Sequence, residues 1–158
     1  MDAFLVGIND LCNDLNDNFP TANHGGCAVV AAILGQHLSA YGVVRIVVGD
    51  DQCTPITIEN ARKLIHSNTL KEWNKNGLWF GHVVVVEFDY NGDTWHIDTT
   101  GVYPASEYLM SGDFPVLEGV MTLHEITELS NSAGWNTAFQ RRHIPNIRAM
   151  IERKFGGM

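Results

Sequence analysis

The segment from Ala28 to Leu34 is apolar at every position, and it constrains the fold more than any other part of the chain. Together with the following Gly35-Gln36-His37-Leu38 it predicts a helix without a polar face, which Gly42 would end. A helix that is hydrophobic all round is stable in water only when other elements cover it. We therefore expect this helix to lie buried at the centre of the fold.

The rest of the chain predicts helices around a few strands. Apolar residues from Phe4 to Leu15 recur at helical spacing, and Tyr90-Asn91-Gly92 lies between two strand-like segments as the strongest hairpin signal. Thr122 and Glu125 form a capping box. The expected elements are helix 4–15, the buried helix, strand 43–48, one or two helices within 57–75, strands 78–89 and 94–100, a mostly irregular stretch 101–121 with a helical turn at 105–110, helix 123–129, and a last helix over 135–155 that is interrupted or begins again at Pro145.

This order predicts an α+β fold, with a small antiparallel sheet packed against the central helix. A length of 158 residues predicts one domain, 1–158. Hydrophobic residues make up 45% of the chain and charged residues 18%, as in globular proteins. We expect no membrane span, because no apolar run approaches 18 residues. The acidic N-terminus and the three Cys without a CxxC pair predict a cytoplasmic protein without an export signal.

The net charge of −8 argues against a general nucleic-acid binder, but the charge is uneven along the chain. Residues 141–158 hold five basic residues and one acidic residue, for a net charge of +4. We expect this last helix to lie on Asp10, Asp14 and Asp17 of its own chain. The alternative is that it binds an acidic partner.

Cys27 is the first candidate for chemistry, because it begins the buried helix directly after Gly25-Gly26. The free N–H groups and the dipole of a helix N-terminus stabilise an anion, and this lowers the pKa of a thiol placed there. The two glycines would let a substrate backbone approach. The competing interpretation is that Cys27 is a small buried hydrophobic residue, the common fate of a free cysteine.

His82 opens the apolar strand GHVVVVEF, and Asp98 lies on the expected partner strand. A two-residue turn at Asn91-Gly92 would pair Tyr90 with Asp93 and put His82 and Asp98 on opposite faces. A three-residue loop would pair Asp89 with Asp93 and put them on one face as diagonal neighbours. We expect the second register, because a cysteine nucleophile needs a base and the base needs an orienting carboxylate.

These stretches resemble a known family of enzymes. NHGGCAVVAAILGQHLSAYGVVRIVVGD and GHVVVVEFDYNGDTWHIDTTG are similar to the nucleophile helix and the His–strand–turn–strand–Asp hairpin of papain-like cysteine enzymes, particularly the transglutaminase-like and arylamine N-acetyltransferase branches. The resemblance covers residues 23–50 and 79–101. It implies a papain-like fold in which Cys27 is the nucleophile, His82 the general base and then acid, and Asp98 the orienting residue.

The site needs two donors for the oxyanion, which we expect to be the Cys27 backbone N–H and Asn23. Trp79, with Gly25 and Gly26, is expected to line the substrate cleft. A metal site of His82, His96 and Asp98 is the less favoured alternative, since no close ligand pair supports it, and we expect no cofactor.

The predicted function is that of a cysteine hydrolase, namely a peptidase, isopeptidase or amidase that acts on a peptide or protein through an acyl-thioester. One alternative is an acyl transferase of transglutaminase type with the same triad. The other is a papain-like binding or assembly protein without activity.

Overall fold

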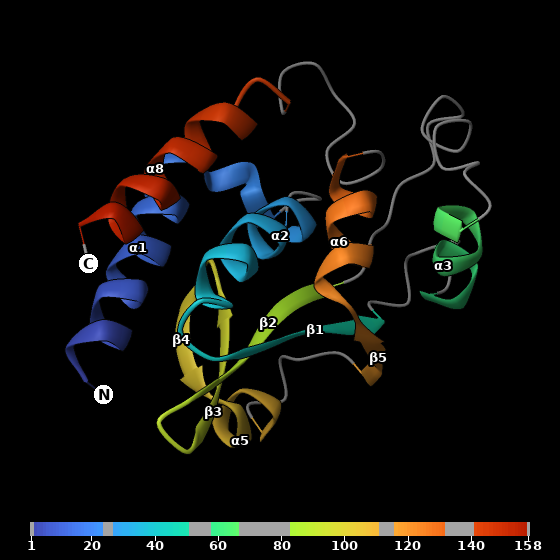
Figure 1. Ribbon diagram of the computed structural model, residues 1–158, viewed down its shortest axis with the longest axis horizontal. Coiled ribbons are helices and arrows are strands. Elements are labelled where there is room, and N and C mark those ends of the chain that lie inside the picture. Colours follow the sequence, from blue (N-terminus) through green and yellow to red (C-terminus); the bar gives the residue numbers. More distant parts are fainter. Residues whose placement is uncertain are drawn as a thin grey trace.

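The computed structural model describes residues 2–23, 27–50, 58–66, 83–110, 116–131 and 141–157, which form an α+β fold (Figure 1). The elements in chain order are α1 (Ala3–Asn18), η1 (Pro20–Asn23), α2 (Cys27–Leu38), β1 (Val43–Asp50), α3 (Ile58–His66), β2 (Val83–Tyr90), β3 (Asp93–Asp98), β4 (Gly101–Pro104), α5 (Ala105–Met110), β5 (Val116–Met121), α6 (Leu123–Leu129) and α8 (Ile144–Gly156).

The described strands form one antiparallel sheet in the order β4-β3-β2-β1-β5. Side chains of a strand alternate between the two faces, so each face has its own composition. One face is apolar and buried by helices, and it carries Ile46, Val48, Val84, Val86, Phe88, Ile97, Val102 and Met121. The other face carries charged residues of β1 and β2 beside the buried Val47 and Val85.

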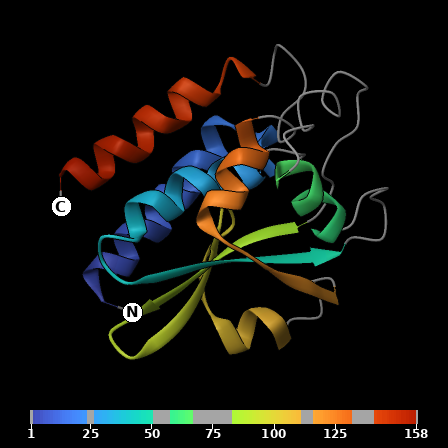
Figure 2. The ribbon, with the colours of Figure 1, turned by 45° about the vertical axis from the view of Figure 1, so that its right-hand side comes forward.

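Helix α2 lies between the sheet and a second group of helices, as its apolar sequence requires. It contacts β1, β2 and β3 on one side and α6 and α8 on the other. Figure 2 shows α1, α2, α6 and α8 on one side of the sheet and α5 on the opposite side. Gly35 is part of this arrangement, because a Cβ at that position would lie 2.9 Å from Leu123 of α6. The prediction of a central buried helix is confirmed.

Helix α1 packs against β4, the strand at one edge of the sheet. The side chain of Asp2 caps its N-terminus by accepting a hydrogen bond from the Leu5 N–H at 3.0 Å. Asn9 extends the β4 hydrogen bonding, because its Oδ1 accepts from the Val102 N–H at 3.0 Å. The apolar stripe of the helix is buried at Leu5, Ile8, Leu11, Cys12 and Leu15.

The sequence did not predict strands β4 and β5. It did predict that the last helix could begin again at Pro145, and α8 begins there. The stretch 101–121 contains β4 and β5 rather than mostly irregular chain. Both are edge strands, and their Pro104 and Gly119 are residues that strand propensity disfavours. The capping box of Thr122 and Glu125 is confirmed at α6. Helix α8 begins at Ile144 with Pro145 in its first turn, in agreement with a helix that begins again at this proline.

Helix α8 lies against α1 and α2, but its charges do not pair with those of α1. In the described part of the chain, Arg148, Arg153 and Lys154 form no ion pair with the three aspartates of α1, namely Asp10, Asp14 and Asp17. The expected contact of the last helix with α1 is therefore present, but the described charges of the two helices do not pair. The buried residues Ile147, Ile151 and Phe155 hold the helix instead. Among the described residues, no helix has the length and apolarity to cross a membrane.

Gly42 is required by the approach of another strand rather than by a helix end. Helix α2 ends at Leu38, and Gly42 follows a turn directly before β1. A Cβ at Gly42 would overlap the backbone oxygen of Asp89 and lie 2.9 Å from the ring of Phe88. The prediction that Gly42 ends the helix is therefore wrong. Glycine is needed at this position because Asp89 and Phe88 lie too close to admit a side chain.

We predict that Gly42→Ala destabilises the protein by roughly 1–3 kcal/mol, because a backbone atom must move to admit the methyl group. The measurement is the free energy of unfolding in urea. Gly156→Ala is the matched control, since a Cβ at that helical position meets no atom within 4 Å. An equal loss of stability in both variants would contradict the explanation.

Candidate functional site

Cys27 is the first residue of α2 and lies partly buried beside the sheet. It lines a cavity of about 10 Å³ with the Asp98-Thr99 end of β3. A cavity of this size holds at most about one water molecule. The other lining residues, Val30, Ala31, Leu34, Val84 and Ile97, are apolar and buried. Cys27 therefore borders a small cavity with mostly apolar walls, where α2, β2 and β3 meet.

The pKa of the Cys27 thiol is raised, which corrects the expectation of a thiolate. Burial is the largest cause, because it disfavours the charged form. Hydrogen bonding by backbone groups of Val84, Ala28 and Cys27 itself acts in the opposite direction, as a helix N-terminus should. The charge of Asp98 raises the pKa further. In this environment a neutral thiol is favoured unless a base accepts its proton.

Asp98 is brought to the cavity by the end of β3. The strand stops there because the Asp98 carboxylate turns the chain into β4: its Oδ1 accepts hydrogen bonds from the backbone N–H of Thr100, at 2.7 Å, and from the Thr100 hydroxyl. Asp98 also pairs with Gly101 across the turn. The carboxylate thus has a structural role at the β3–β4 turn, and its charge also acts on the Cys27 thiol.

The β2–β3 hairpin has the register that we did not expect. Tyr90 pairs with Asp93 and Phe88 with Trp95, so the loop has two residues. Both have positive φ, 51° at Asn91 and 84° at Gly92, as a type I′ turn requires. The three-residue loop is therefore wrong, and the observed two-residue turn is the pairing that would put His82 and Asp98 on opposite faces of the hairpin. Asp98 lies near the thiol because it ends its strand at the cavity.

Several predicted site residues lie outside the described part of the chain. These are His82, Trp79, Gly25 and Gly26. Asn23 ends η1, but its side chain is also outside that part. Their roles as base, cleft wall and oxyanion donor remain predictions.

The other cysteine of the described chain is unsuited to chemistry. Cys12 is fully buried in the core on α1, and burial, followed by the charge of Asp98, raises its pKa to about 12. This agrees with its place on the apolar stripe of the first helix. Cys53 lies outside the described residues.

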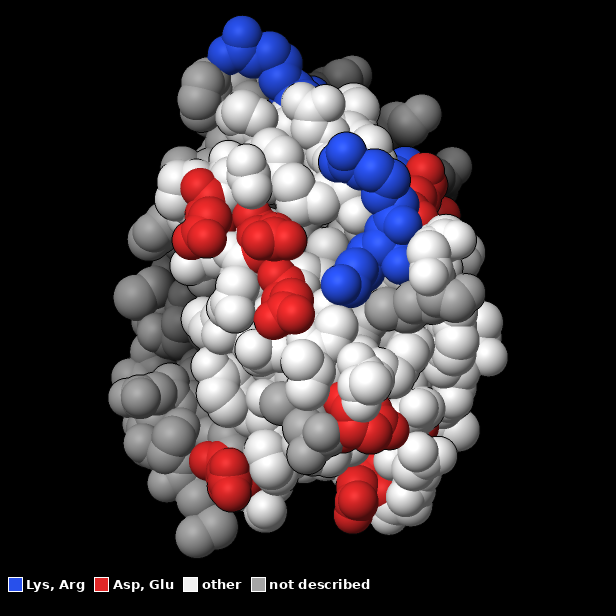
Figure 3. All heavy atoms as spheres, turned by 90° about the vertical axis from the view of Figure 1, so that its left-hand side faces the viewer, with Lys and Arg blue, Asp and Glu red and all other residues white. Residues whose placement is uncertain are grey.

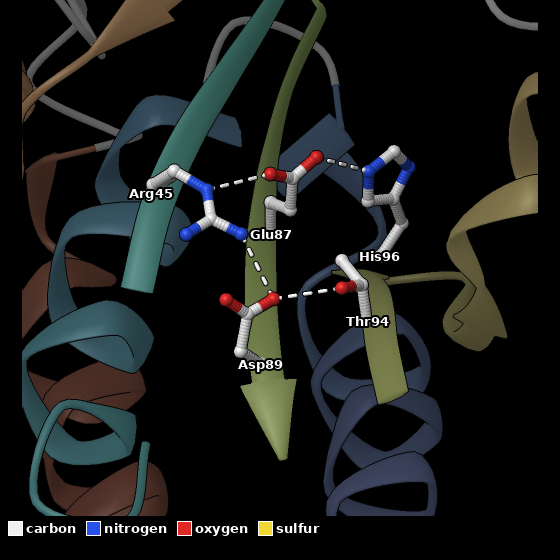
Figure 4. A network of polar contacts seen from close by, with 5 residues as sticks. All are labelled: Arg45, Glu87, Asp89, Thr94 and His96. Atoms are coloured by element: carbon white, nitrogen blue, oxygen red, sulfur yellow. Dashed lines mark hydrogen bonds and ion pairs between the residues drawn. The ribbon is translucent and has the colours of Figure 1, made fainter. Parts of the chain in front are cut away.

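A second polar cluster lies on the face of the sheet that points away from α1 and α2 (Figure 4). His96 of β3 is fully buried, and its Nε2 lies 2.9 Å from Oε2 of Glu87 on β2. Arg45 of β1 donates to Glu87 at 2.7 Å and to Asp89 at 2.8 Å, and Asp89 accepts from the Thr94 hydroxyl at 2.8 Å. The cluster thus joins three adjacent strands.

The pKa of Glu87 lies below its usual range. Burial raises this pKa, but hydrogen bonds from His96 and Arg45, together with the Arg45 charge, outweigh the effect of burial. A carboxylate only accepts hydrogen bonds, so the His96 Nε2 carries the hydrogen. His96 is therefore a structural partner of Glu87. In the described ranges no three His, Cys, Asp or Glu residues come together as a metal site.

Sequence reasoning missed the Glu87–His96 pair. Two features of the sequence could have revealed it. Glu87 is a charged residue directly after four valines of a strand, and a two-residue hairpin at Asn91-Gly92 sets Glu87 opposite His96. Comparison of the chain with protein-family models, with curated proteins and with solved structures returned no match. Any assignment of function therefore rests on the geometry around Cys27 and around Glu87.

We predict that Glu87→Gln lowers the free energy of unfolding by about 1–2 kcal/mol at pH 7, because it weakens charge-assisted hydrogen bonds to Arg45 and His96. The folded-state pKa of Glu87 lies below its unfolded value, so this stabilisation is present at neutral pH and is lost as the pH falls through the folded-state pKa. Urea unfolding at several pH values between neutral and acid measures both effects, and the two proteins should converge at low pH.

The matched control is Glu59→Gln. Glu59 pairs with Lys63 at 3.7 Å, and both side chains are more than two-thirds exposed. Its removal should change stability by less than about 0.5 kcal/mol. An equal effect at the two positions, or a difference that persists in acid, would contradict the role given to Glu87.

Proposed function

We propose that this chain is a cysteine hydrolase of papain-like type that cleaves an amide, peptide or isopeptide bond in a peptide or protein. The observation that carries the proposal is the meeting of Cys27 and Asp98, from distant parts of the sequence, at one cavity where a helix begins. A central helix that presents a cysteine at its N-terminus to an antiparallel sheet supports the papain-like assignment. A free thiol of this kind suits a reducing compartment such as the cytoplasm.

The raised pKa of Cys27 determines what the mechanism needs. A neutral thiol is a poor nucleophile, so a base must remove its proton. We assign this role to His82, which directly precedes β2 in the sequence; Val84 of that strand is one of the cavity residues. Asp98 would stabilise the imidazolium by its charge rather than as a diagonal cross-strand neighbour. The same carboxylate that disfavours an isolated thiolate thus favours a thiolate–imidazolium pair.

The proposed reaction uses two oxyanion donors and one general base. The Cys27 sulfur attacks the carbonyl carbon, and the oxyanion takes hydrogen bonds from the Cys27 backbone N–H and from Asn23. The His82 imidazolium gives its proton to the leaving amine, which leaves a thioester on Cys27. Water, deprotonated by His82, attacks the thioester and releases the acid and the thiol. The cavity beside Cys27, of about 10 Å³, is too small to hold a substrate. The substrate therefore binds outside this cavity, at the N-terminus of α2.

We predict that iodoacetamide labels Cys27 much faster than Cys12 below pH 7, and that His82→Ala removes this advantage. The physical reason is that the pair with imidazolium supplies a thiolate at a pH where burial alone would leave a thiol. Rates at each cysteine are measured by mass spectrometry across pH 5–9. Cys12 is the internal control, because its pKa of about 12 keeps it inert. Labelling of Cys27 that rises only in alkali would contradict the proposal and favour a binding protein without activity.

Asp98→Asn separates the two roles of this carboxylate. If His82 holds the proton, the substitution removes the partner of the imidazolium, and we expect slower labelling of Cys27 at pH 6 and loss of hydrolysis. If Asp98 only repels negative charge at Cys27, its removal lowers the thiol pKa and labelling becomes faster. Faster labelling would therefore overturn the triad. Thermal unfolding of the variant shows whether the β3–β4 turn is intact.

A further inference from the structure

The face formed by α1 and α8 carries a row of acidic side chains. Asp10, Asp14 and Asp17 are all exposed, and their spacing of four and three residues places them on one side of α1. At 1.5 Å per residue the row is about 10 Å long. Figure 3, which shows this face, has one group of red side chains in its upper half and further red side chains near its lower end and at its upper right.

A basic pair lies beside this row. Arg153 is exposed and Lys154 is half-buried, both in the last turns of α8. Figure 3 shows blue side chains beside the red group and at the same height, with uncharged side chains between the two and a further red side chain on the other side of the blue ones. Neither of the two basic residues forms an ion pair with any other described residue. The opposite charges of these described residues thus lie on two helices that pack together, and no ion pair joins them.

The same face also exposes apolar side chains. Val6 precedes Asp10 by four residues on α1 and is 44% exposed. Tyr41 is 42% exposed, and its ring lies 4.7 Å from that of Phe4 on α1 and 6.0 Å from that of Phe155 on α8. Of the four exposed large hydrophobic residues in the described chain, two are therefore here. Apolar groups rimmed by charges are typical of a protein interface.

The charge pattern selects the kind of partner. A polyanion or an acidic protein would be attracted by Arg153 and Lys154 but repelled by the three adjacent aspartates. A partner that satisfies both groups must carry a basic patch and an acidic patch side by side. The α1–α8 face is itself such a surface, so a second copy of the chain is complementary to it.

We propose that two copies associate through their α1–α8 faces as a twofold-symmetric dimer. The two helices run antiparallel and lie next to each other (Figure 1). A twofold axis that runs parallel to them and midway between them puts the acidic row of each copy on the basic pair of the other. Each contact is then made twice, as in any isologous interface. This inference is independent of the proposed function.

The test uses two charge-reversed variants, Asp10→Lys/Asp14→Lys and Arg153→Glu/Lys154→Glu, at constant ionic strength. Sedimentation equilibrium of the wild type should show a monomer–dimer equilibrium. Each variant alone should dimerise at least about tenfold more weakly, because every ion pair of the interface becomes a repulsion. An equimolar mixture of the two should associate again as a heterodimer, since reversed acidic rows face reversed basic pairs.

Arg148→Glu is the matched control, because Arg148 is on the same helix but lines the groove against α2 and α6. It should leave the wild-type equilibrium nearly unchanged. Circular dichroism and thermal unfolding show that each variant is folded. A wild type that is monomeric up to its solubility limit overturns the proposal. The proposal is also overturned if the charge-reversed variants dimerise as strongly as the wild type. It is overturned as well if both folded variants lose association and their mixture does not restore it.

Discussion

The burial of α2 is the constraint on which the rest of the structure depends. Its residues from Ala28 to Leu34 are each no more than 3% exposed, so no side of this helix faces water. The sheet must be apolar on the face toward α2, and α6 and α8 must cover the opposite side. Gly35 lets α6 approach closely enough to do so. The hydrophobic contribution of such burial, about 25 cal/mol per Å² of apolar surface, dominates the stability of a domain this size.

The same burial sets the chemistry available at Cys27. A helix N-terminus offers N–H groups that favour a thiolate, whereas the apolar surroundings of a central helix disfavour it. Burial is the larger effect here, and the nearby Asp98 carboxylate adds to it. A cysteine in such a place is inert by itself and becomes reactive only with a base that takes its proton. The balance between these effects decides whether the thiol or the thiolate is present at this position.

The outer face of the sheet is organised by a different interaction, the Arg45–Glu87–His96 cluster. It joins β1, β2 and β3 where apolar packing alone would not distinguish one register from another, because Val83 to Val86 are identical residues. Arg45 lies opposite Glu87 and can satisfy both Glu87 and Asp89 at once. A shift by one residue would leave these charges without partners on a largely buried face, so the cluster favours the observed pairing.

The sequence by itself determined the central helix, the amphipathic α1, the capping box of α6 and the location of the hairpin, because these depend on neighbouring residues and on local periodicity. Tertiary structure decided the hairpin register, the edge strands β4 and β5, and the pKa of Cys27. The sequence around Asn91-Gly92 permits two pairings, and the positive φ of both residues, which selects the two-residue turn, is seen only in the folded structure. The helix N-terminus and the burial of α2 were visible in the sequence, but the burial of the Cys27 thiol at that N-terminus was not. Depth is a property of all the elements that surround the thiol, and it decides whether the charged form is stable.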